Sequence, residues 1–187
     1  MPFFTSKKEK HLWIWVLAVF AAIFSTLFIG QPLAAIFGNQ DVQALIFGSV
    51  MILVGITIVV HAFRTKANKI EITVLIGVVA VYSMLFLRLG LPERSHLMEY
   101  SVLAIFIHNA INERVKQGKK VFIPALLAIM IAFMVGVFDE CIQIFLPNRV
   151  FDPMDIVFNG FAIVMAIGFS VLIKWVRRQI QKRKLKR

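Results

Sequence analysis

Six long apolar stretches divide this 187-residue chain, and each qualifies as a membrane-spanning helix. A helix rises about 1.5 Å per residue, so about 20 mostly apolar residues cross the hydrocarbon of a bilayer. The six predicted spans are 12–30, 42–63, 70–87, 95–111, 121–146 and 155–176. The sequence therefore predicts an all-α, polytopic integral membrane protein.

The composition supports this fold class and leaves little room for anything else. Hydrophobic residues make up 59% of the chain and charged residues only 17%, whereas about a quarter of the residues of a soluble protein are charged. The loops between the predicted spans are too short for independent structure, so we expect residues 1–187 to form a single membrane domain. The only cysteine, Cys141, excludes an internal disulfide, and we expect it to be a packing residue.

The basic residues indicate how the chain is oriented. With six spans and both termini on one side, 18 of the 21 Lys and Arg residues lie on that side, and only Arg88, Arg94 and Arg149 lie on the other. Under the positive-inside rule the basic side, with both termini, is cytoplasmic. The net charge of +11 is concentrated in short runs beside apolar segments. It therefore favours a membrane surface as partner and argues against nucleic acid.

The acidic residues are distributed the opposite way. Three are on the inner side, and seven are in the outer loops or the outer halves of the spans: Asp41, Glu93, Glu99, Asp139, Glu140, Asp152 and Asp155. Acidic residues contribute little to topology, so the positive-inside rule does not account for this distribution. The outer acidic residues need a separate explanation.

Helical spacing places several of these residues on common faces. At about 100° per residue, Glu93, His96 and Tyr100 fall within about 60° of one another, and Glu99 projects about 60° beyond His96. The fifth predicted span begins with 18 uncharged residues, 121–138, and a second polar face follows them. The sixth predicted span begins with a third polar face. The residues of these two faces are Asp139, Glu140 and Gln143, then Asp155 and Asn159.

Polar groups at one depth of a membrane require compensation. An ionised group in the hydrocarbon costs about 2.5 kcal/mol or more, so the cluster calls for mutual pairing, water or a ligand. One interpretation is structural, with Arg94 and Arg149 neutralising the carboxylates. The other, which we favour, is a functional pocket at the outer face.

The same residues resemble a known family. The order is His96 and Tyr100 on one helix, then Glu140 and Gln143 as Glu-x-x-Gln, then Arg149 in a turn, then Asp155 and an Asn159–Gly160 pair. This pattern is similar to that of the VanZ-like family of bacterial membrane proteins. It covers residues 93–168, and the first three spans carry no motif that we can match. The resemblance implies a multi-pass protein of the bacterial cytoplasmic membrane with an envelope function and, for the founding member, low-level teicoplanin resistance.

Three functional hypotheses follow. In the first, the pocket binds or modifies a cell-envelope lipid intermediate, a peptidoglycan precursor or a lipophilic glycopeptide. Arg149 then holds a phosphate or carboxylate by its bidentate fork. The other predicted ligand-binding residues are Tyr100, Gln143, Asp155 and Asn159, supported by Glu99 and Asp139.

The second hypothesis is a hydrolase or transferase acting on a lipid-linked phosphate or sugar, with His96 and Glu140 as acid and base. Asp139 or Asp155 could then hold a divalent cation through oxygen ligands, although no cofactor is required by the sequence. No nucleophile elbow or His-Glu-x-x-His motif selects a reaction or favours zinc. The third is a proton- or ion-coupled transporter, ranked lower because the polar groups lie toward one face. The sequence does not specify an oligomeric state.

Overall fold

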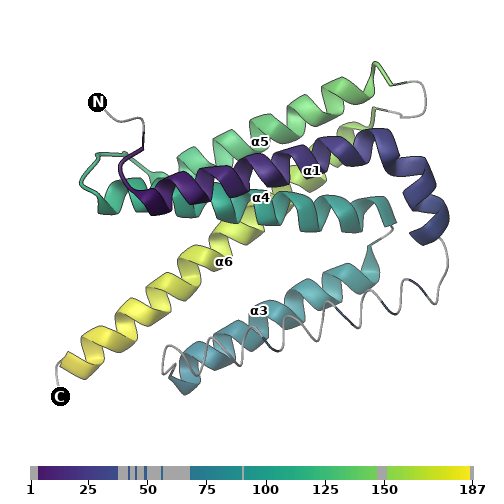
Figure 1. Cartoon of the computed structure of the whole chain (residues 1–187). Coiled ribbons are helices and arrows are strands. Elements are labelled where there is room, and N and C mark those ends of the chain that lie inside the picture. The colour runs from purple at the N-terminus through teal and green to yellow at the C-terminus, as the bar shows by residue number, and fades with distance from the viewer. Residues whose placement is uncertain are drawn as a thin grey trace. The chain divides into compact units, whose positions relative to one another are not determined.

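Helices are the only regular secondary structure in the part of the chain that the structure describes. The computed structural model describes residues 4–37, 68–89, 91–146 and 151–185, together with the single positions 42, 45, 49 and 56. These residues form the helices α1 (Lys7–Phe37), α3 (Lys69–Arg88), α4 (Leu91–Lys116), α5 (Pro124–Gln143) and α6 (Pro153–Leu185) (Figure 1). Within these residues there is no β-strand.

Among the described residues, four helical segments are long and apolar enough to cross a membrane, which agrees with the predicted class. They are Lys7–Phe28, Lys69–Arg88, Pro124–Gln143 and Pro153–Arg183. The fourth predicted span corresponds to α4, which has 26 residues but carries charged side chains near both ends and is not among the four. The second predicted span, 42–63, lies almost entirely outside the described residues. The described residues thus support a polytopic helical protein, but the count of six rests on the sequence.

Local signals explain where α5 and α6 begin. Gly118, in the turn after α4, has a φ of 86°, a left-handed conformation that glycine adopts without steric cost. Pro124 opens α5, and Pro153 opens α6, where the missing N–H of proline is not needed. Asp152 caps α6, because its Oδ1 accepts a hydrogen bond of 2.8 Å from the backbone N–H of Met154.

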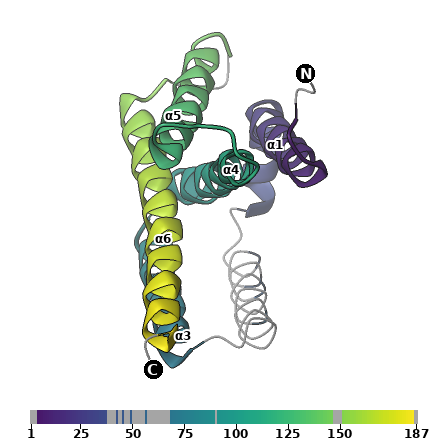
Figure 2. The same ribbon diagram turned by 90° about the vertical axis from the view of Figure 1, so that its left-hand side faces the viewer.

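The chain forms two compact units, Met1–Leu27 with Leu89–Val171, and Phe28–Arg88 with Leu172–Arg187. In the first unit α4 is the central helix, and Figure 2 shows it between α1 and α5. Trp15 of α1 stacks on Phe106 of α4 with ring centroids 6.0 Å apart, and Ser101 of α4 donates a hydrogen bond of 3.4 Å to the Ala162 carbonyl of α6. The core of this unit includes Leu103, Ala104, Ile107, Ala132 and Ile163, all fully buried.

Small residues bring three helices of the first unit close together. Ala128, Ala132 and Gly136 are buried on α5 at intervals of four residues, the spacing that lets helix backbones approach in a membrane. A Cβ atom on Gly136 would lie 3.2 Å from Cβ of Asn159 on α6 and 3.3 Å from Cε1 of Tyr100 on α4. Gly136 therefore marks a close approach of α5 to both neighbours.

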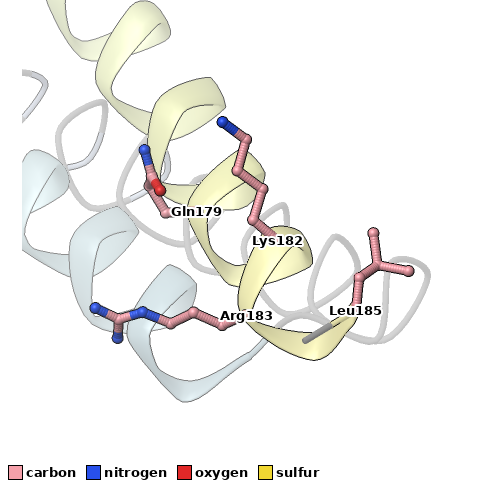
Figure 3. A pocket seen from close by; sticks show the side chains of 4 residues that line it. All are labelled: Gln179, Lys182, Arg183 and Leu185. Carbon is pink, nitrogen blue, oxygen red and sulfur yellow. The ribbon is translucent and has the colours of Figure 1, made fainter. Parts of the chain in front are cut away.

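The second unit contains α3 and the C-terminal part of α6. Its main polar contact joins Glu71 of α3 to Arg177 of α6, whose Nε and Nη2 both donate to Oε1 of Glu71. Farther along α6, an open hollow is lined by Gln179, Lys182, Arg183 and Leu185, and Figure 3 shows Lys182 and Arg183 extending in different directions. None of these four residues belongs to the predicted site.

Candidate functional site

The predicted polar faces meet at one end of the first unit. Helices α4 and α6 start at this end and α5 finishes there, on the right of Figure 1. The antiparallel course of α5 thus brings His96, near the start of α4, to residues near the end of α5. The α6 residues Asp155 and Asn159 lie in the first two turns of that helix.

Three ionisable groups form the centre of this cluster. His96, Asp139 and Glu140 each offer one potential ligand atom, and the three atoms lie within 4.8 Å of one another. Asp139 is 2% exposed and Glu140 is 0% exposed. The side chain of His96 is 13% exposed, and its Nε2 lies 3.6 Å from Oδ2 of Asp155, whose side chain is 20% exposed. The cluster therefore combines one imidazole with three carboxyl groups.

Two neutral side chains orient the carboxylates. The fully buried Tyr100 donates its hydroxyl to Oδ2 of Asp139 at 2.9 Å. Gln143, one turn after Glu140, donates Nε2 to Oε1 of Glu140 at 2.9 Å. The ring of Tyr100 also stacks on that of His96, with centroids 6.0 Å apart and an interplanar angle of 15°. These contacts restrict the directions in which the three central groups point.

Several buried polar atoms at this end have no hydrogen-bond partner among the described residues. Asn159 is 0% exposed, and neither its Nδ2 nor its Oδ1 has such a partner. The same holds for Oε2 of Glu140 and Nδ1 of His96. Asn159 lies against Gly136, which also faces the Tyr100 ring, beside the cluster. Buried amides are nearly always hydrogen-bonded, so this amide calls for an explanation.

The remaining predicted residues differ in their placement. Arg149 lies outside the described residues. Glu99 is half-buried on α4 and is not one of the three central groups. Arg94 donates Nε to the Leu89 carbonyl at 2.8 Å and so supports the turn before α4. Cys141 is exposed, so the expected packing role within the protein is wrong.

The three acidic residues predicted for the inner side have a different environment from the cluster. Each is paired with a basic side chain: Glu9 with Arg114 at 2.7 Å, Glu71 with Arg177, and Glu113 with Lys8 at 3.7 Å and Lys116 at 3.9 Å. Glu9, which is 0% exposed, also accepts hydrogen bonds from the N–H and hydroxyl of Thr5. A lysine or arginine therefore neutralises each of these three carboxylates. The basic side chain beside Asp139 and Glu140 is instead the imidazole of His96.

Sequence reasoning missed Gly136, which brings the helices of the site together. The signal was present as the four-residue spacing of Ala128, Ala132 and Gly136. It was overlooked because these residues are apolar and carry no functional group. The contact between Tyr100 and Asp139 was also missed, since it depends on how α4 and α5 are rotated about their axes.

The fold and the cluster define a polytopic helical membrane protein with buried ionisable groups at one end of a helix bundle. The VanZ/LLP1 family model matches residues 2–174, so the chain belongs to this family. The match extends well beyond the 93–168 segment recognised from motifs and includes the first three predicted spans. Neither the curated proteins nor the solved structures gave a significant match.

Proposed function

We propose that this chain binds an amphipathic molecule of the cell envelope at the outer ends of α4, α5 and α6. The ligand is a lipid-linked envelope intermediate, a peptidoglycan precursor or a lipophilic glycopeptide, and its polar head enters the cluster while its acyl part lies along the apolar helices. Family membership supports a role in the membrane. The chemistry of the cluster supports the kind of head group.

The observation that carries this proposal is the buried Asn159 amide. It has no hydrogen-bond partner among the described residues, although Asn159 is 0% exposed. A buried polar group without a partner costs about 1–3 kcal/mol, and a leucine of similar shape would avoid that cost. An asparagine here is therefore explained by a polar ligand that donates to and accepts from the amide.

The described part of the site is rich in hydrogen-bond acceptors. Asp139, Glu140 and Asp155 present carboxyl oxygens, which accept from sugar hydroxyls or peptide N–H groups. Lipid-linked sugars and glycopeptides both carry such donors. Arg149, which stands between Gln143 and the first residue of α6 in the sequence, supplies the complementary charge for a phosphate or carboxylate in this proposal.

The proposed orientation places this end of the bundle outside the cytoplasm. It assumes six spans with both termini cytoplasmic, in the cytoplasmic membrane of a bacterium. The support is the distribution of basic residues, of which 18 of 21 then lie on the inner side. The exposed Lys182 and Arg183 near the end of α6 suit the anionic surface of the inner leaflet.

Binding is tested with the full chain in lipid nanodiscs. The probes are a lipid-linked peptidoglycan precursor, an acylated glycopeptide and a glycopeptide without an acyl chain. We expect Asn159→Leu to weaken capture of an acylated probe by about tenfold, equivalent to about 1.4 kcal/mol. The same variant should leave the stability of the unliganded protein unchanged or raise it, because the unsatisfied amide is removed.

Asn112→Leu is the matched control. Asn112 lies at the other end of α4, where its Nδ2 donates to the His108 carbonyl of the same helix at 2.6 Å. This variant should bind the probes as the wild type does. Equal affinity of Asn159→Leu and wild type for every probe, or no binding by the wild type, would contradict the proposal.

A second candidate function is catalysis on a lipid-linked phosphate or sugar. The observation that favours it is the proximity of His96 to the carboxyl groups of Asp139 and Glu140, which pairs an imidazole with carboxyls in a largely buried site. Wild type, His96→Ala and Glu140→Gln are incubated with envelope intermediates and divalent cations, and the products are separated. Turnover by wild type and its loss in both variants supports catalysis; no turnover by wild type across the panel counts against it.

A further inference from the structure

The donor atoms at the end of α5 match those of a metal site. The three potential ligand atoms of His96, Asp139 and Glu140 lie within 4.8 Å of one another, so a point exists within about 2.8 Å of all three. Metal–ligand distances in proteins are about 2.0–2.6 Å. A small adjustment of side-chain torsions would therefore bring all three atoms into coordination range. We propose that His96, Asp139 and Glu140 bind a divalent metal cation.

The charges of the cluster support a cation. Asp139 and Glu140 are adjacent in sequence and almost completely buried, and Asp155 also lies beside His96. Buried carboxylates repel one another unless a positive charge or a proton lies between them. A divalent cation bound between the imidazole and the two α5 carboxylates neutralises that repulsion.

The buried Asn159 amide, which also supports the proposed function, is a second indication of a ligand beside the cluster. It lies beside the cluster, against Gly136, and its oxygen has no hydrogen-bond partner among the described residues. An amide oxygen either coordinates a cation directly or accepts a hydrogen bond from a metal-bound water. Oε2 of Glu140, which also lacks such a partner, is available as a metal ligand.

The contacts around the central groups are those expected of a supporting shell. Tyr100 donates a hydrogen bond to one oxygen of Asp139, and Gln143 donates one to a single oxygen of Glu140. The second oxygen of each carboxylate can therefore bind a metal. Hydrogen bonds of this kind orient ligating carboxylates in metalloproteins. One nitrogen and several oxygen donors favour a transition metal over Mg²⁺ or Ca²⁺, because imidazole is a poor ligand for hard cations.

The test uses the full chain purified in lipid nanodiscs, stripped with EDTA and dialysed. Mn²⁺ is the main probe, with Zn²⁺, Mg²⁺ and Ca²⁺ for comparison, and bound metal is measured by mass spectrometry and electron paramagnetic resonance. We expect about one bound Mn²⁺ per chain, with ¹⁴N hyperfine coupling from His96. No envelope ligand is added, so this result is independent of the proposed function.

The informative variants are His96→Gln and Glu140→Gln. In Glu140→Gln the new amide oxygen can still accept the hydrogen bond from Gln143, so the local fold is retained. Both variants should weaken Mn²⁺ binding by more than tenfold, and His96→Gln should abolish the ¹⁴N coupling. Gln143→Leu, which removes a supporting hydrogen bond, should weaken binding by about tenfold. Glu113→Gln, a carboxyl change at the other end of α4, is the control and should bind as wild type does.

Stability supplies a readout that does not depend on spectroscopy. A cation that binds only the folded protein raises its melting temperature, so Mn²⁺ should raise the melting temperature of wild type and Glu113→Gln but not of Glu140→Gln. The proposal is overturned if wild type binds none of the four cations above the level of Glu140→Gln. It is also overturned if both His96→Gln and Glu140→Gln retain wild-type affinity.

Discussion

The hydroxyl of Tyr100 on α4 donates a 2.9 Å hydrogen bond to Oδ2 of Asp139 on α5, in a part of the bundle where both residues are buried. The two residues are 39 positions apart in the chain, so this bond fixes the rotation of one helix against the other. It also joins the aromatic face that carries His96 to the acidic face that carries Glu140.

Removing this bond should lower stability. Tyr100→Phe takes a donor away from a buried carboxylate, so we predict a loss of about 1–3 kcal/mol in the free energy of unfolding. Unfolding in detergent mixtures measures it. A double-mutant cycle with Asp139→Leu, whose side chain cannot accept this hydrogen bond, separates the contact from other effects. A coupling energy near zero would contradict a direct interaction.

A methyl group on Gly136 should disturb the site. Its Cβ would lie 3.2 Å from Cβ of Asn159, and neither this atom nor the Tyr100 ring is a flexible chain end. We predict that Gly136→Ala is about 1–2 kcal/mol less stable than Gly168→Ala. The comparison is matched, since Gly168 is also within a helix but a Cβ atom added there would meet nothing within 4 Å. Equal melting temperatures of the two variants would show that α5 has room at Gly136.

The buried Glu9 should depend on Arg114. Arg114→Met leaves the carboxylate of Glu9, which is 0% exposed, without its cationic partner. Because the Arg114 side chain is 37% exposed, water replaces part of the interaction, and we predict a loss of about 1–3 kcal/mol. Lys8→Ala is the contrast, with a change below about 0.5 kcal/mol, since Lys8 is 68% exposed in its pair with Glu113. The double variant Glu9→Gln with Arg114→Met should recover part of the loss; no recovery would argue against the pair.

The proposed topology makes a labelling prediction. The exposed Cys141 is first replaced by serine, and single cysteines are then introduced as Asn148→Cys or Lys119→Cys. On intact spheroplasts a membrane-impermeant maleimide should label Asn148→Cys and leave Lys119→Cys unlabelled until the cells are opened. The reverse pattern would invert the orientation and place the cluster at the cytoplasmic face.

The proposed ligand class makes a prediction in cells. Expression of the wild-type chain in a susceptible bacterium should raise the inhibitory concentration of teicoplanin more than that of a glycopeptide without an acyl chain, because the acyl part contributes to binding in the bilayer. Asn159→Leu should remove the increase, and Asn112→Leu should retain it. If Asn159→Leu gave the same increase as the wild type, resistance would not depend on this site.

Local features of the sequence were enough for the class of protein and for the helix ends at which the polar groups lie. Apolar runs and helical spacing are local properties, so the positions of α1, α3, α5 and α6 followed from them, and α4 was recognised despite its charges. The same spacing put His96, Glu140 and Asp155 at one end of their helices. The binding roles of these residues, and the transport interpretation, stay predictions.

The tertiary structure decided which of those groups touch. How far a helix turns about its axis, and how closely it approaches another, depends on packing against side chains distant in sequence, such as Tyr100 and Asn159 against Gly136. Packing also separated the acidic residues into two kinds. Those predicted for the inner side, such as Glu9, each lie against a lysine or arginine, whereas Asp139 and Glu140 lie against His96. The sequence by itself determined six apolar stretches and the positions of the charges between them, because both follow from composition along the chain. The contact of α4 with α5 that brings the imidazole of His96 to two buried carboxylates exists only in the folded bundle.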